Sequence, residues 1–252
     1  MSFSGYRPYF EKASMYKMLA DYYRDNNPTL HEYYHKKHIK NIEKMISSQR
    51  SELSVQQEKP ARVRVLHAAP GIGNVDIYLN GMRILKNFPY KKLTHYLSLP
   101  KGKYQIDVYP VDNLTSTLIS RKVEVAPDKM YTLAATGSDK NFYLLAFEDE
   151  PHVPAGEAKL RFVHLSPDTP PVDVAVKHSD TAFSAIPFRK ATPYLGVTPM
   201  TLDLEVRPTG SDQTALSLPN VQLQPNTAYS IYAIGLSKPN TPNKLEALIL
   251  IP

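Results

Sequence analysis

The chain of 252 residues has no cysteine and no tryptophan. The absence of cysteine excludes disulfide scaffolds, thiolate zinc fingers, iron–sulfur sites and thiol catalysis. No run of 18 apolar residues occurs, so we expect no membrane-spanning segment. Glycine is scarce, with 10 residues against 22 prolines. This ratio, together with frequent Val, Thr and Tyr, favours strands joined by rigid corners over long helices.

Charge and targeting signals are also sparse. The first residues contain no apolar stretch of the kind that secretory signal peptides carry, so we predict no signal peptide. The net charge of +6 is divided into +3 for residues 1–59, +3 for residues 60–150 and zero for residues 151–252. No stretch has five like charges in a row, whereas nucleic-acid binders concentrate their charge on a face or a tail. We therefore expect no nucleic-acid partner.

An internal repeat organises the chain beyond residue 60. His67 and His164 are 97 residues apart, and Pro89 and Pro187 are 98 residues apart, which places one extra residue in the second copy between Asp173 and Pro187. The matched segments include 62–70 with 161–167, 75–77 with 172–174, 88–92 with 186–190, 96–97 with 194–195, 106–110 with 204–208, and Gly137 with Gly235. The near-constant offset predicts two homologous domains, residues 60–149 and 150–252, behind a different segment, residues 1–59.

Each repeat is predicted to be all-β. Residues 103–110 and 201–208 alternate between apolar and polar side chains, which is typical of a half-buried strand. Asn80-Gly81 lies between two apolar runs and predicts a type I′ hairpin. About seven short strands per repeat, separated by turn residues, indicate two tandem immunoglobulin-like β-sandwiches. Residues 148–157 combine acidic residues, proline and glycine and are predicted to link the two domains.

Two motifs carry a resemblance to a known family. The opening strand of each repeat ends in His-x-x-Pro and is followed by Val-Asp-Ile or Val-Asp-Val. In these motifs the chain resembles tandem copies of the bacterial DUF4397 domain over residues 60–252. The resemblance implies β-sandwich proteins that are mostly secreted or surface-associated, with no established catalytic residues. The motif residues, expected to be structural, are His67, Pro70, Asp76, His164, Pro167 and Asp173.

Residues 1–59 are predicted to form a helix pair. Asn26-Asn27-Pro28 separates two runs with helical periodicity, and the polar residues 47–59 are expected to be a flexible connector. About 50 residues bury too little apolar surface to be stable alone, so we expect the pair to pack on a β domain or another chain. This makes the helices the expected contact for protein or surface-polymer partners, and an oligomer stays open. The predicted apolar stripes are Met15, Met18, Leu19, Tyr22 and Tyr23 in the first helix, and Tyr34, His38, Ile42, Met45 and Ile46 in the second.

The sharpest catalytic pattern is the H-E-x-x-H of residues 31–35. In zincins two histidines one helical turn apart bind zinc and the glutamate polarises water, and His38 would extend the same face here. However, residues 29–32 also form a capping box with Thr29 as N-cap, which accounts for Glu32 without catalysis. A zincin further needs a third ligand at a set distance and a surrounding domain. We therefore predict no catalytic residue and no cofactor, and leave adventitious metal binding by His31, His35 and His38 open.

The remaining candidates recur in both repeats. His67 and His164 share a strand face with apolar residues and are predicted to be partly buried, with one ring nitrogen hydrogen-bonded near the sheet end. Asp76 and Asp173 are out of phase with their apolar neighbours and are expected to face outward or to bond to a loop. Two basic pairs at equivalent positions predict either a solvated loop or a contact with an anionic polymer: Lys91, Lys92, Arg189 and Lys190.

Three functional hypotheses follow. The preferred one is a non-enzymatic structural or adhesion protein of a bacterial cell or spore outer layer, such as a spore coat, in which two sandwiches follow a helical attachment segment. The predicted lack of a signal peptide keeps a cytoplasmic location as the alternative. The second hypothesis is a glycan or anionic-polymer binding module that uses the two basic pairs. The third is a metal-dependent hydrolase at residues 31–35.

Overall fold

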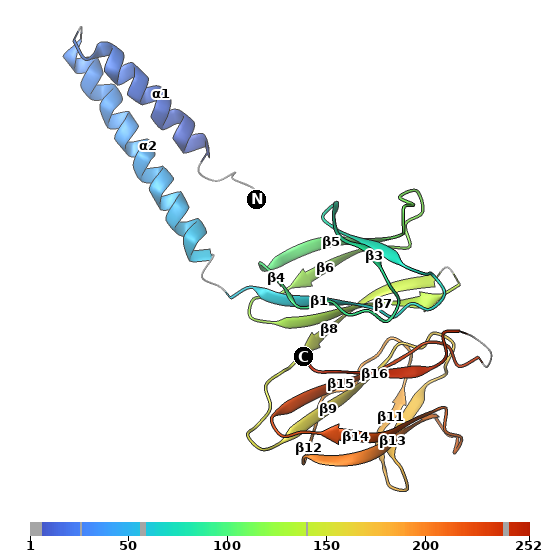
Figure 1. Ribbon diagram of the computed structural model, residues 1–252. Helices are drawn as coiled ribbons and strands as arrows, with labels where there is room; N and C mark the ends of the chain where they lie inside the picture. Colours follow the sequence, from blue (N-terminus) through green and yellow to red (C-terminus); the bar gives the residue numbers. More distant parts are fainter. Residues whose placement is uncertain (1–6, 26, 56–58, 140, 239–241) are drawn as a thin grey trace. The chain divides into compact units, whose positions relative to one another are not determined.

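The computed structural model describes residues 7–25, 27–55, 59–139, 141–238 and 242–252 (Figure 1). These fall into two compact units, Met1–Lys59 and Pro60–Pro252. The first unit contains the helices α1 (Arg7–Tyr23) and α2 (Pro28–Val55), and the described elements of the second are all strands. Within the described ranges, no helix combines the length and the apolar character needed to cross a membrane.

The two helices pack through an alternation of tyrosine and alanine. On α1 the residues turned toward α2 are spaced four and three apart, and the small ones, Ala13 and Ala20, are buried. The ring of Tyr34 on α2 stacks between the rings of Tyr16 and Tyr23, with centroids 6.3 Å and 5.7 Å away. Alanine lets the helix backbones approach each other, while the tyrosines supply most of the apolar contact area. The helix pair is thus confirmed, and Tyr34 and His38 of the predicted α2 stripe do contact α1, but the α1 contact face differs in part from the predicted one.

Several details of the predicted helices are wrong. Met18 and Tyr22, placed in the packed stripe, are each 69% exposed, because the packed face is the neighbouring Tyr/Ala stripe. The N-cap of α2 is Asn27, whose Oδ1 accepts a hydrogen bond from the backbone N–H of Leu30 at 3.1 Å, whereas Thr29 lies inside the helix. Pro28 then occupies the first helical position, where a backbone N–H would have no acceptor within the helix, so proline costs no hydrogen bond. The predicted connector 47–59 is helical to Val55, and residues 56–58 lie outside the described residues.

Each repeat is a sandwich of eight strands, against about seven predicted. The first contains β1 (Ala61–His67), β2 (Val75–Leu79), β3 (Met82–Phe88), β4 (Leu97–Leu99), β5 (Gly102–Pro110), β6 (Ile119–Val125), β7 (Met130–Ser138) and β8 (Asn141–Asp149). The second contains β9 (Ala158–His164), β10 (Val172–Val176), β11 (Thr181–Ile186), β12 (Leu195–Val197), β13 (Met200–Pro208), β14 (Leu216–Leu223), β15 (Thr227–Ile234) and β16 (Glu246–Leu250). The first sandwich consists of the sheets β4-β1-β7-β8 and β3-β2-β5-β6, and the second of the equivalent sheets β12-β9-β15-β16 and β11-β10-β13-β14.

The chain pairs its strands in the same way in both repeats. β1 runs parallel to β7, and β9 runs parallel to β15, while the other ladders are antiparallel. Asn80 and Gly81 form the predicted two-residue turn between β2 and β3, with φ of 48° and 79°. The extra residue of the second copy lies in its longer β10–β11 connection, as predicted. The offset between the repeats then grows to 103 residues at the last strand. The equivalent residues Thr136 and Ile234 pair with Tyr143 and Glu246, which are 103 residues apart.

The strands β1, β7, β9 and β15 are buried on both faces. Inward residues such as Val63 and Phe162 belong to the cores of the two sandwiches. The alternate residues form a third apolar cluster made from both repeats, which includes Leu66, Val163 and Tyr232. The sheets β4-β1-β7-β8 and β12-β9-β15-β16 therefore face each other, and the four sheets of residues 60–252 stack as one four-layer body (Figure 1).

The segment predicted to link the two domains is shorter than expected. β8 extends to Asp149, so Glu148 and Asp149 are strand residues and the connection begins at Glu150. Acid and proline content suggested a linker, but Asp149 is fully buried, because its carboxylate is held between the two repeats.

Candidate functional site between the two repeats

The motif histidines each fasten a loop to the end of a strand. His67 is completely buried; its Nε2 lies 2.9 Å from the carbonyl oxygen of Gly73, and its Nδ1 accepts the N–H of Ala69. His164 is also buried, and its Nε2 lies 3.2 Å from the carbonyl oxygen of Pro170. A backbone carbonyl at Nε2 and a backbone N–H at Nδ1 select the neutral tautomer that carries its proton on Nε2. Both histidines are hydrogen-bonded at the sheet end as predicted, but they are completely instead of partly buried, and both ring nitrogens of each have a partner.

Burial makes these histidines a source of acid sensitivity. It lowers the pKa of His67 and of His164 below the ordinary value of 6.5. Below pH 6.5 these histidines bind protons in the unfolded chain but stay neutral in the folded one. The free energy of unfolding therefore decreases as the pH is lowered, by up to about 1.4 kcal/mol per pH unit for each histidine. We expect urea titrations between pH 7.5 and about pH 5 to show this slope, and the double variant His67→Gln/His164→Gln to lose most of it. His152→Gln, which removes an exposed histidine, is the matched control.

The motif aspartates hold a bulge in the neighbouring strand. Asp76 is buried, and its Oδ1 accepts the backbone N–H of Asn87 at 2.8 Å. Asp173 Oδ1 likewise accepts the backbone N–H of Ala185. The two residues that donate these bonds, Asn87 and Ala185, have positive φ of 52° and 51°. The bulges interrupt the β2–β3 and β10–β11 ladders, which frees these N–H groups. The expectation of an outward-facing or loop-bonded carboxylate is wrong for Asp76, which is buried and bonded to a residue of β3, whereas Asp173 is half-buried and also accepts the hydroxyl of Thr209 after β13.

The predicted basic residues are split between the interface and the solvent. Lys91 forms an ion pair with Glu246 of the second repeat, and the guanidinium carbon of Arg189 lies 4.3 Å from the ring centroid of Tyr143 in the first. These two contacts are equivalent in the two repeats. The side chains of Lys92 and Lys190 are exposed, while their backbone carbonyls accept the N–H groups of the motif histidines. Polymer binding by the four residues stays a prediction, with two of them engaged by the opposite repeat.

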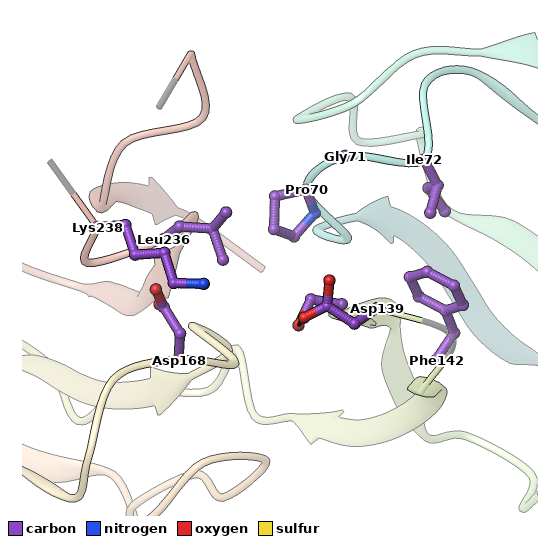
Figure 2. A pocket seen from close by; sticks show the side chains of 9 residues that line it. Pro70, Gly71, Ile72, Asp139, Phe142, Asp168, Leu236 and Lys238 are labelled. Carbon is purple, nitrogen blue, oxygen red and sulfur yellow. Dashed lines mark hydrogen bonds between the residues drawn. The ribbon is translucent and has the colours of Figure 1, made fainter. Parts of the chain in front are cut away.

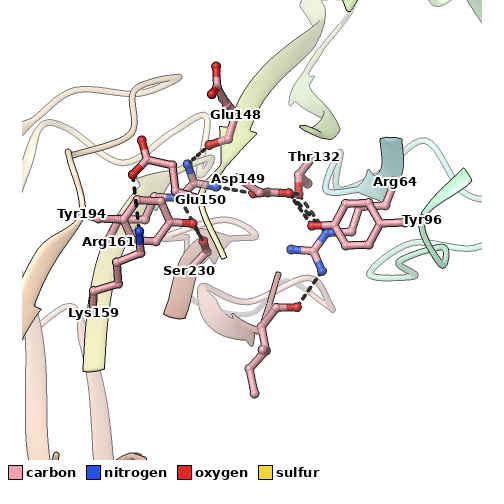
Figure 3. A network of polar contacts seen from close by, with 11 residues as sticks. Arg64, Tyr96, Thr132, Glu148, Asp149, Glu150, Lys159, Arg161, Tyr194 and Ser230 are labelled. Carbon is pink, nitrogen blue, oxygen red and sulfur yellow. Dashed lines mark hydrogen bonds and ion pairs between the residues drawn. The ribbon is translucent and has the colours of Figure 1, made fainter. Parts of the chain in front are cut away.

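Two buried arginines and one aspartate clasp the repeats together (Figure 3). Arg161 Nη2 donates to Asp149 Oδ1, and Arg64 Nε lies 3.7 Å from Asp149 Oδ2. Thr132 and Tyr96 donate their hydroxyls to the same Oδ2, each at 2.6 Å. Asp149 thereby receives charge-assisted hydrogen bonds from both repeats, which offset the cost of burying its carboxylate. Burial, more than the nearby carboxylate, raises the pKa of Tyr96, which keeps its hydroxyl a donor.

The clasp shows that the two repeats are related by an approximate two-fold axis. Each arginine stacks on a tyrosine, with 4.6 Å between the guanidinium carbon and the ring centroid in both cases. Arg64 Nη1 donates to the carbonyl oxygen of Ile251, and Arg161 Nη1 donates to that of Glu148, at 2.8 Å and 2.6 Å. Residues 148 and 251 occupy equivalent places at the ends of β8 and β16. The equivalent groups are Arg64 with Arg161, Tyr96 with Tyr194, and Thr132 with Ser230.

Sequence reasoning missed the clasp. Its signal was present, because an arginine recurs at the same place inside an apolar strand of both repeats. Charged residues are almost never fully buried unless they are paired, so Arg64 and Arg161 could have been recognised as candidates for an internal ion pair.

The other end of the interface is an open groove of about 580 Å³ (Figure 2). β8 runs from this groove, which Phe142 lines, to the clasp, which contains Asp149. The groove is formed by the loops after β1 and β9, the β7–β8 turn and the segment after β15. Its lining residues are Pro70, Gly71, Ile72, Ser138, Asp139, Phe142, Asp168, Leu236 and Lys238.

The H-E-x-x-H residues take part in helix packing. Nδ1 of His31 lies 2.8 Å from the carbonyl oxygen of Ala20, and Nδ1 of His38 lies 2.9 Å from that of Ala13. Glu32 forms an exposed ion pair with Lys36. In the part of the chain that the structure describes, no three His, Cys, Asp or Glu side chains are grouped to hold a metal ion. The geometry of these residues gives the hydrolase hypothesis no support.

Comparison with known proteins identifies a family but no function. No curated protein matches the chain. Among solved structures, the chain is 8% identical to CBMbc, a family CBM26 module of Eubacterium rectale Amy13K in complex with maltoheptaose, with a TM-score of 0.23 over 75% of this chain and 96% of that one. It is 8% identical to BF2867, a candidate cell adhesion protein of Bacteroides fragilis NCTC 9343, with a TM-score of 0.17 over 78% and 97%. At such TM-scores neither likeness bears on function.

The family model for DUF4397, a domain of unknown function, matches residues 61–175 and 165–250. The two matches overlap and together cover most of the chain: the first contains the first repeat and continues into β9 and β10, and the second covers most of the second repeat. The chain therefore belongs to the DUF4397 family.

Proposed function

We propose that the protein is a non-enzymatic structural or adhesion protein of a bacterial cell or spore outer layer, with residues 1–59 as its attachment segment. The sandwiches, residues 60–149 and 150–252, would be the displayed body. The observation that carries this proposal is the pairing of a rigid double sandwich with a helix pair that has an unusually apolar surface. A body with a shared core and a buried ionic clasp is suited to bearing contacts without changing shape.

The helix pair carries the features of an attachment segment. Half of the exposed large apolar side chains of the described residues lie on it: Phe10, Met15, Met18, Tyr22, Tyr33, Ile39 and Ile46. Soluble proteins rarely expose apolar side chains at such density unless a partner covers them. Lysines such as Lys37, whose ammonium lies 5.4 Å from the ring centroid of Tyr33, add a positive character. We infer that these helices bind a protein or a surface polymer.

Cell fractionation with a fluorescent fusion tests the proposal. We expect the full chain to sediment with the outer layers of growing or sporulating cells. The variant Met18→Glu/Tyr22→Glu should release most of it into the soluble fraction, because it places charges on the exposed apolar face without touching the packed one. Ser14→Glu, at an exposed polar position of the same helix, is the control and should stay bound.

The same fractionation distinguishes the alternatives. A uniform cytosolic signal in both growth states would contradict the outer-layer location. Release by Lys92→Glu/Lys190→Glu, with the helix variant still bound, would favour binding of an anionic polymer by the sandwiches instead. That alternative is motivated by two exposed lysines at equivalent positions of the two repeats.

A further inference from the structure

The groove between the repeats combines loops from both sandwiches. In Figure 2, Pro70, Gly71, Ile72, Asp139 and Phe142 of the first repeat face Asp168, Leu236 and Lys238 of the second. Its volume lies within the range of ligand-binding clefts, and such clefts occur preferentially at domain interfaces. The body behind it is held by the shared core and the clasp, so the two walls keep a fixed separation. A preformed cleft of this kind loses little conformational entropy on binding.

The lining of the groove has two chemical characters. Pro70, Ile72, Phe142 and Leu236 give it an apolar surface. Asp139 and Asp168 add one carboxylate from each repeat, and neither forms an ion pair with a described Lys, Arg or His side chain within 4.0 Å. Two buried aspartates elsewhere in residues 60–252, Asp149 at the interface and Asp76 at the first bulge, are instead paired with arginine.

The carboxylate of Asp168 is also held in place. Its Oδ1 accepts the backbone N–H of Ser237 at 2.8 Å and the hydroxyl of Ser166 at 3.4 Å. These bonds fix a negative group beside the apolar lining without neutralising it. Asp139 lies across the groove at the β7–β8 turn with φ of 56°. Among the described residues that line it, the groove therefore presents two negative groups and one positive group, Lys238.

We propose that this groove binds an extended segment of a partner protein in which a Lys or Arg lies next to an apolar residue. The apolar side chain would cover Ile72 and Phe142, and the basic side chain would pair with Asp139 and Asp168. Charge complementarity favours this occupant over an uncharged saccharide, because a cationic side chain adds ionic attraction to the hydrogen bonds that a neutral hydroxyl could also donate to the two carboxylates. The inference does not depend on the outer-layer location proposed above, so either can fail alone.

Fluorescence anisotropy with defined peptides tests the proposal on the full chain. The probes are labelled peptides of the form Gly-Ser-Φ-Lys-Φ-Ser-Gly, with Φ as Leu, Phe, Val or Tyr, together with the Arg and Glu versions of each. We expect Lys and Arg peptides to bind, Glu peptides to bind at least about tenfold more weakly, and added salt to weaken the binding. Asp139→Asn and Asp168→Asn should each lower the affinity about fivefold, because each removes a charge but keeps the shape.

Two controls separate the site from general electrostatics. Asp112→Asn alters an exposed aspartate with the same φ of 56° outside the groove and should leave binding unchanged. Lys238→Ala should strengthen the binding of basic peptides, because it removes a like charge. Equal binding of Lys and Glu peptides, or no effect of both Asp→Asn changes, would overturn the proposal, as would the absence of binding by every peptide. Binding of uncharged oligosaccharides that Asp139→Asn and Asp168→Asn leave intact would reassign the groove to saccharides.

Discussion

Replacing Asp149 by alanine is expected to lower the free energy of unfolding by about 3–5 kcal/mol, the usual cost of removing one partner from a buried ion pair. The side chain is 0% exposed, and its loss leaves Arg64 and Arg161 buried without their carboxylate. Thr132 and Tyr96 lose their acceptor at the same time. Urea denaturation followed by tyrosine fluorescence and far-UV circular dichroism measures the change.

The residue that follows Asp149 supplies the control. Glu150 is 61% exposed and lies 3.4 Å from Lys159. Because the Glu150 carboxylate itself is exposed to solvent, Glu150→Ala should cost less than about 1 kcal/mol. Asp149→Asn should fall between the two, because the amide keeps the shape but not the charge. A cost for Asp149→Ala as small as that for Glu150→Ala would show that the clasp does not stabilise the body.

Gly137→Ala and Gly235→Ala are expected to destabilise the protein nearly as much. The two glycines are equivalent in the repeats and have φ of 126° and 90°. A Cβ at Gly137 would overlap the backbone carbonyl oxygen of Asn141, and one at Gly235 would overlap that of Lys244. Because backbone atoms must move in both cases, we expect a loss of at least about 3 kcal/mol for each, the sum of overpacking and backbone strain.

Gly156→Ala isolates the steric part of this effect. Gly156 also has positive φ, 81°, but a Cβ there would meet nothing within 4 Å. Its replacement should cost only the about 1–2 kcal/mol of the left-handed conformation. Thermal melts and urea titrations of the three variants give the comparison. Similar losses at all three positions would mean that φ alone explains why glycine recurs at residues 137 and 235.

The sequence was most informative where one face of a strand meets water. β5 and β13 alternate in burial as their apolar and polar residues predicted, because one side packs on a core and the other is solvated. The repeat added the matching positions of the histidines, the aspartates and the glycines. These features depend on local periodicity and turn chemistry, which a single sequence records.

The features that involve both repeats could not be predicted in this way. β1 and β9 are buried on both faces, and no local pattern states that the second face meets another sandwich. Lys91 and Arg189 were each predicted to lie in a solvated loop or to contact an anionic polymer, because their partners, Glu246 and Tyr143, are distant in the chain. The groove likewise joins loops whose proximity follows only from the approximate two-fold packing.

The parallel pairing of β1 with β7 has a mechanical consequence. If residues 1–59 hold the protein to a surface, a pulling force enters the sandwiches at Pro60 and runs along β1. The hydrogen bonds between β1 and β7 are then loaded side by side in shear, since the paired residues from Arg62 to His67 lie across the direction of pull. Bonds loaded together must break together, whereas a hairpin pulled at its open end unzips one bond at a time. Forced unfolding is governed by the unfolding rate, so a protein tethered through β1 would resist tension better than its thermodynamic stability alone indicates.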